Sequence, residues 1–119
     1  MNSSKQLYQV TGELRLDQLN FKVTPWKLLI ETNRYYEIKP VNGPVKRLYK
    51  EKLNIAVHET KSYCDGTLTV SGFSMEEHIE EMQRMIVDQL ESIIRKYLQD
   101  LELNQKALQL KPATAKARV

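Results

Sequence analysis

The sequence predicts an α+β fold in which an antiparallel β-meander of four to five strands is followed by one long carboxy-terminal α-helix. Two patterns lead to this prediction. Apolar and polar side chains alternate through much of residues 5–72, which is typical of strands with one buried face. Across residues 74–110, apolar side chains recur every three or four positions without an interrupting glycine or proline, which is typical of a helix.

The length of the chain indicates one domain. At 119 residues it lies near the common size of a single domain, and a composition of 41% hydrophobic and 28% charged residues is that of a folded protein. We expect a single domain over residues 1–111, with strands within about 5–72 and the helix at about 74–110. Residues 112–119 then form a short basic tail.

The first predicted strands lie in the segment LYQVTGELRL and its continuation. Tyr8, Val10, Leu14 and Leu16 occupy alternate positions and so share one sheet face, with Gly12 at the place of a bulge. A short strand with Phe21 and Val23 follows. Pro25 is expected to end it, because proline cannot donate to a central ladder.

The next strands are predicted to form a hairpin around the turn at residues 40–44. Its first strand has one apolar face, made by Trp26, Leu28, Ile30, Tyr36 and Ile38. The second strand is expected to continue past Lys52, with Leu53, Ile55 and Val57 toward the core. Asp65-Gly66 then indicates a two-residue hairpin turn into a last strand at residues 67–70.

The helix has a start signal and a long apolar stripe. Ser74 is the expected N-cap, with Glu77 completing a capping box. A helix of this length spans about 55 Å, which is more than the sheet can cover. Its carboxy-terminal half is therefore expected to pack on another copy of the chain or on a different protein. The expected interface residues are Ile86, Leu90, Ile93, Tyr97, Leu101 and Leu108.

The stretch RYYEIKPVNGPVKRLYKEK is the candidate ligand-binding region. Residues 1–62 hold eleven Lys/Arg against six Asp/Glu, whereas residues 74–108 hold four against eight. Amines, guanidinium groups and phenol rings together suit nucleic acid or a nucleotide, because cations neutralise phosphates and rings stack on bases. The candidate residues are Arg34, Tyr35, Lys39, Lys46, Arg47, Lys50 and Lys52.

Strand phasing divides that hairpin between two faces. It places Tyr35, Lys39, Lys46, Lys50 and Lys52 on the polar face, and Arg34 and Arg47 on the apolar phase near the strand ends or the tip. Tyr36, Ile38 and Tyr49 are assigned to the core-facing side. The competing interpretation is a solvated sheet face, in which interspersed glutamates pair with the lysines across strands.

Catalytic and metal-binding motifs are not found. The chain has no nucleophile-elbow, phosphate-loop, zinc-protease or dinucleotide-binding pattern. One cysteine, Cys64, and two histidines cannot complete a structural zinc site without acidic residues. We therefore expect no enzyme activity, no cofactor and no bound metal. Without a signal peptide or a membrane-length apolar run, we expect a cytoplasmic protein that does not bind membranes.

Two functions follow as hypotheses. The first is an oligomeric, non-enzymatic protein that binds nucleic acid or a nucleotide through the basic hairpin. The second is a protein–protein adaptor, inhibitor or assembly subunit that uses the apolar helix surface, for example one encoded by a virus or mobile element. In its order of elements, a meander and then one helix, the chain is similar in outline to small dimeric single-strand-binding proteins and to small viral or mobile-element inhibitors.

Overall fold

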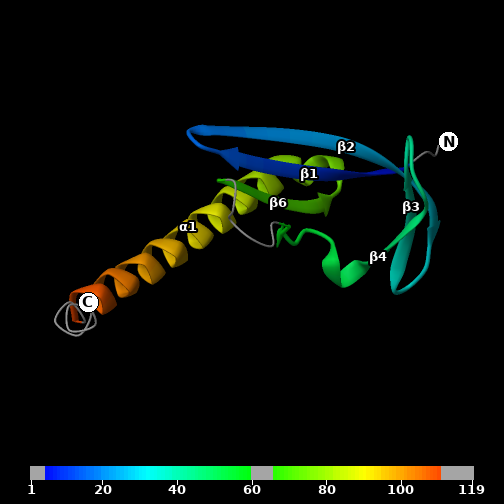
Figure 1. Cartoon of the computed structure of the whole chain (residues 1–119). Coiled ribbons are helices and arrows are strands. Elements are labelled where there is room, and N and C mark those ends of the chain that lie inside the picture. The colour runs from blue at the N-terminus through cyan, green and yellow to red at the C-terminus, as the bar shows by residue number, and fades with distance from the viewer. Residues whose placement is uncertain (1–4, 60–65, 111–119) are drawn as a thin grey trace.

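The computed structural model describes residues 5–59 and 66–110. It confirms the α+β class: within these ranges, an antiparallel sheet of six strands, more than the four or five predicted, is followed by one long helix (Figure 1). The strand order across the sheet is β4-β3-β2-β1-β6-β5. The predicted tail at 112–119, Cys64, and Asp65 of the predicted turn lie outside the described residues.

The elements follow one another along the chain with short connections. They are β1 (Gln6–Arg15), β2 (Gln18–Glu31), β3 (Tyr35–Pro40), β4 (Lys46–Tyr49), the 3₁₀ turn η1 (Lys50–Lys52), β5 (Val57–His58), β6 (Thr67–Ser74), the 3₁₀ turn η2 (Glu76–His78) and α1 (Ile79–Leu110).

β2 is much longer than predicted, because Pro25 does not end it. The Leu28 N–H donates to the Lys5 carbonyl, 3.1 Å apart, so the alternation of antiparallel bonds turns the nitrogen of Pro25 away from β1. On its other side, β2 pairs with β3 only from Trp26 onward. The donor that proline lacks is therefore not needed by either neighbouring strand.

The first core lies between α1 and the strands β1 and β6. Val10, Leu68, Val70, Met82, Ile86 and Leu90 are its buried members. Gly12 is not at a bulge, since β1 keeps regular register with both β2 and β6 there. A Cβ atom at Gly12 would instead lie 2.5 Å from Cγ2 of Ile86. The glycine therefore lets the helix approach the sheet closely.

A second core lies on the opposite face, where the sheet curls. Leu7, Tyr36, Ile38, Leu48 and Phe73 are its buried members. The ring of Trp26 packs edge-on against that of Phe73 at a centroid distance of 5.4 Å. β2 makes the curl possible, because its first part pairs with β1 and its last residues pair with β3. In Figure 1, β3 and β4 consequently lie across the open end of the β1–β2 hairpin, opposite the turn that joins β1 to β2.

The strand predicted to run from β4 past Lys52 is broken. β4 ends at Tyr49, η1 follows, and the chain crosses to the opposite edge of the sheet, where β5 pairs with β6. Asn54, at a φ of 63°, donates its N–H to the Phe73 carbonyl at 2.8 Å. This docking turns Ile55 and Val57 outward, so the prediction that they face the core is wrong.

α1 begins later than predicted and extends far beyond the sheet. Ser74 is the last residue of β6, paired with Tyr8, and is not an N-cap. The helix proper starts at Ile79, and Met82, Ile86 and Leu90 are its buried residues. Its later turns project away from the strands (Figure 1), and the molecule measures 77 × 26 × 24 Å. No helix among the described residues is both long enough and apolar enough to cross a membrane.

Candidate binding surfaces

The last part of α1, residues 94–110, is here named the stalk. Its apolar side chains are largely exposed: Leu98 is 56% exposed, Leu101 58% and Leu108 74%. Of the predicted interface residues, Leu101 and Leu108 lie on this surface. Ile93 and Tyr97 are partly buried against the first core. Ile86 and Leu90 are buried within that core, so the sheet of the same chain already covers them.

Four of the exposed apolar residues of the stalk, together with one glutamine, follow a heptad spacing. Ile94, Leu98, Leu101, Gln105 and Leu108 are separated by four, three, four and three positions and form one seam along the helix. We name these five residues the stalk seam. The interface predicted from the sequence includes Leu101 and Leu108 but not Ile94 and Leu98. Only the structure shows that the sheet of the same chain already covers Ile86 and Leu90 and partly covers Ile93 and Tyr97.

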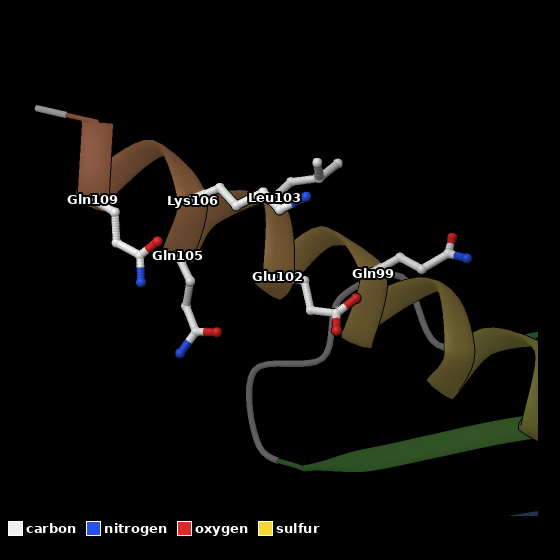
Figure 2. A pocket seen from close by; sticks show the side chains of 6 residues that line it. All are labelled: Gln99, Glu102, Leu103, Gln105, Lys106 and Gln109. Atoms are coloured by element: carbon white, nitrogen blue, oxygen red, sulfur yellow. The ribbon is translucent and has the colours of Figure 1, made fainter.

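A largely polar surface adjoins the seam along the stalk. Figure 2 shows Gln99, Glu102, Leu103, Gln105, Lys106 and Gln109 projecting from successive turns. In the part of the chain that the structure describes, the hollow of about 440 Å³ between them is bordered by α1 alone, so no second described element encloses a ligand there. Gln105 belongs both to this surface and to the seam.

The apolar surface of the stalk continues onto the sheet. Leu19, Phe21 and Val23 of β2 lie on the helix side of the sheet, because their partners in β1 are Leu14, Gly12 and Val10. All three are more than a third exposed. Phe21 borders a hollow together with Val87, and Val87 precedes Ile94 by two helical turns on the same side of α1. One apolar band therefore joins β2 to the seam.

The basic hairpin is divided differently from the prediction. Tyr35 pairs with Tyr49 and Glu37 with Arg47, so these four side chains share one face. We name them the outer face. The guanidinium of Arg47 lies 4.2 Å from the centre of the Tyr35 ring, whose centre is 5.7 Å from that of Tyr49. Tyr49 and then Tyr35 raise the pKa of Arg47 above its usual value. The assignments of Arg47 to the apolar phase and of Tyr49 to the core side are therefore wrong.

Two predicted polar-face lysines lie on the core side instead. The Lys46 amine is 5.2 Å from the centre of the Phe73 ring. The Lys50 amine is 5.1 Å from that of Tyr36 and bonds the Glu31 carboxylate at 2.8 Å. This hydrogen bond lowers the pKa of Glu31 and raises that of Lys50. The prediction assumed one continuous strand through Lys52, in which the sides of Lys46 and Lys50 follow from those of Leu53, Ile55 and Val57. Because η1 interrupts that strand, the alternation after Lys52 does not continue the alternation before it.

The remaining candidate residues do not form one cluster. Arg34 is exposed at the start of β3, where its carbonyl accepts the Lys50 N–H. Lys39 is four residues from Tyr35 on the same strand, so both side chains lie on the same face. The Nζ of Lys39 is 3.5 Å from the Pro40 carbonyl oxygen. Lys52 is exposed on η1. The structure thus brings together Tyr35, Arg47 and, in phase, Lys39, and it separates them from Lys46 and Lys50.

A groove that the sequence did not indicate lies between the two edges of the curled sheet. It has a volume of about 330 Å³, with β4 on one side, β5 and its preceding segment on the other, and Phe73 of β6 in its lining. Ile55, Val57 and Tyr49 each expose more than two-fifths of their surface here. We name this hollow the edge groove. The β4 and β5 strands are distant in sheet order and meet only because the sheet curls.

The ionisable groups elsewhere offer little chemistry. No group of three or more metal-ligating side chains occurs among residues 5–59 and 66–110. His78 lies with its Nδ1 2.5 Å from a Glu81 carboxylate oxygen, on the exposed start of the helix. His58 has a buried Nε2 without a hydrogen-bond partner in the described part of the chain.

Comparison with protein-family models, curated proteins and solved structures found no significant match.

Proposed function

We propose that this protein is a non-enzymatic assembly protein whose α1 helix pairs with α1 of a second copy, leaving the curled sheet as a head that contacts further partners. The observation that supports this most is the stalk seam, exposed along a helix that extends beyond its own sheet. Removing such apolar area from water contributes about 25 cal/mol per Å². A surface of this kind is typical of a protein contact.

A second copy fits the seam better than an unrelated helix. A heptad seam is complementary to itself, since side chains of one helix fill the spaces of the other. The stalk has three Lys/Arg and two Asp/Glu, so two stalks do not repel strongly. The apolar band on β2 lies beside the seam and enlarges the area that a two-fold contact could bury.

Sedimentation equilibrium tests this proposal. The wild type is expected at twice the chain mass of 13.9 kDa. Leu101→Lys combined with Leu108→Lys should give a monomer, because two buried cations oppose each other in the seam. Leu103→Lys is the matched control: Leu103 is 62% exposed on the same helix but off the seam, and its replacement should leave the dimer intact. A monomeric wild type, or equal effects of seam and control variants, would contradict the proposal.

Binding of single-stranded nucleic acid by the outer face is the second candidate function. The observation that favours it is the contact of Arg47, Tyr35 and Tyr49, which sets a guanidinium against two rings at the surface. Such a platform can stack bases while the cation meets phosphate. Glu37 weighs against it, since its carboxylate lies 3.5 Å from Arg47 and lowers the positive potential.

Anisotropy of a labelled oligonucleotide across a salt series tests the second candidate. Affinity is expected to fall with salt, and Tyr35→Ala should weaken binding about tenfold through loss of one stacking contact. Lys46→Ala is the control, because Lys46 lies on the core side. An affinity for the oligonucleotide that does not change with salt concentration would rule out the outer face. So would an equal loss of affinity in Tyr35→Ala and Lys46→Ala.

A further inference from the structure

The edge groove is bordered by a strand with unused backbone groups. β4 is an edge strand of the sheet and, among residues 5–59 and 66–110, pairs only with β3. The Lys50 N–H donates to the Arg34 carbonyl at 2.9 Å, and these residues are in register with the β3–β4 ladder. Because antiparallel pairs alternate, the N–H and C=O groups of Arg47 and the N–H of Tyr49 point away from β3, toward the groove. The Tyr49 carbonyl, at the N-cap of η1, belongs to that turn.

The side chains of β4 leave this edge accessible. Lysine and arginine commonly protect an edge strand by extending past it. Here the Lys46 amine lies over Phe73 on one face, and the Arg47 guanidinium lies over Tyr35 on the other. Both cations are held above and below the strand, so they do not shield its outward backbone groups. An incoming strand could therefore pair with β4.

The lining of the groove indicates what would bind. Ile55 and Val57, 44% and 48% exposed, offer an apolar surface for alternate side chains of an extended segment. Lys46, Arg47 and Lys52 line the same groove. Among the described residues of the lining, Glu59 is the only carboxylate, and the Ser71 hydroxyl donates to it at 2.5 Å. The charge of the groove is therefore positive, which complements carboxylates.

We propose that the edge groove binds an extended segment of a partner protein that carries apolar and acidic side chains. The segment adds as a strand to β4, with its backbone bonded to Arg47 and Tyr49. Its apolar side chains lie against Ile55 and Val57, and its carboxylates meet the cations of the lining. Main-chain bonds then supply affinity and the side-chain contacts supply selectivity.

Tyr49 provides a matched pair of variants for the test. Its φ of −71° and ψ of 140° suit proline, and its N–H is not used by β3. Tyr49→Pro therefore removes the outward donor without disturbing the ladder, whereas Tyr49→Ala removes the same ring and keeps the donor. Circular dichroism and thermal unfolding of both variants establish that they fold.

The probe is a phage-displayed library of random linear peptides, selected against the full chain and followed by anisotropy with the enriched synthetic peptides. We expect enriched peptides in which apolar and acidic residues alternate. They should bind Tyr49→Pro at least about tenfold more weakly than Tyr49→Ala, because proline removes one main-chain hydrogen bond and adds a steric clash. Lys52→Ser should weaken binding and reduce its salt dependence, because Lys46 and Arg47 remain in the groove. The Leu101→Lys, Leu108→Lys variant should bind as the wild type does, which separates this site from the stalk.

Several outcomes would overturn the proposal. One is a library from which no peptide is enriched. Another is equal binding to the two Tyr49 variants, which would indicate a side-chain pocket without strand addition. A third is enrichment of peptides without carboxylates. A reduced molecular mass of Tyr49→Pro in sedimentation would show instead that β4 pairs with β4 of a second copy.

Discussion

Gly12 shows how closely helix and sheet approach each other in this protein. A Cβ added there would lie 2.5 Å from Cγ2 of Ile86, which is fully buried. We predict that Gly12→Ala lowers the free energy of unfolding by about 1–3 kcal/mol, the range for overpacking a core. Urea titration monitored by circular dichroism measures this change.

A second variant separates steric clash from other causes. Ile86→Leu removes the branch at Cβ that carries Cγ2, so the double variant Gly12→Ala, Ile86→Leu should be more stable than the sum of the single changes. Additive effects would show that the missing side chain at position 12 serves another purpose.

Glu31 and Lys50 predict a pH dependence. Because the bond to Lys50 lowers the pKa of Glu31 below its usual 4.5, the pair stabilises the folded state above that pH and ceases to do so as Glu31 is protonated. The raised pKa of Lys50 extends this window upward to about its usual 10.5. Glu31→Gln should therefore be less stable than the wild type at pH 7 and equally stable near pH 3. A difference that persists at low pH would contradict the role of the ion pair.

At the scale of elements, alternation predicted β1, and apolar recurrence every three or four residues predicted α1, because each has one buried side. Alternation did not show that the strand predicted from Trp26 to Ile38 is divided by a turn between β2 and β3. It failed where tertiary contacts decide the conformation. Pro25 is tolerated in β2 because β3 ends opposite Trp26, and η1 forms because Asn54 docks on Phe73. The stalk could be predicted, since a stripe longer than any sheet is visible in the sequence. The edge groove could not, because no local pattern identifies which strands the curl brings together.

Pairing with a second copy should stabilise the helical conformation of the stalk, because packing on its own sheet contributes little to its stability. A helical segment of 17 residues is marginal in water by itself, and the stalk packs on the sheet only near its start. We predict rapid amide hydrogen exchange in residues 100–110 at nanomolar concentration and protection at high micromolar concentration. The Leu101→Lys, Leu108→Lys variant should exchange rapidly at both. Strong protection in this variant would show that the helix is stable without a partner.

At the scale of the whole molecule, two cores share one sheet. β1 places Leu7 in the second core and Val10 in the first, and β6 likewise contributes Phe73 and Val70. The strands between the cores are the same, so loss of one core should remove the other. Leu7→Ala and Leu90→Ala should each cost about 2–5 kcal/mol, although these residues lie on opposite faces.

Two spectroscopic signals report the cores separately. Trp26, the single tryptophan, packs against the second core, and the helical signal in circular dichroism arises mainly from α1. We predict that fluorescence and circular dichroism give one coincident urea transition for the wild type and for both alanine variants. Separate transitions would mean that the curled half of the sheet unfolds independently.

The attachment of α1 at one end gives the molecule a mechanical property. The helix is about 48 Å long at the usual rise per residue, and its contacts with the sheet end near Tyr97. A small change in the direction of the helix near Tyr97 is therefore magnified into a larger displacement at Leu110. Probes attached near Leu110 in two paired copies would thus register angular changes within the heads that are too small to observe in the sheet itself.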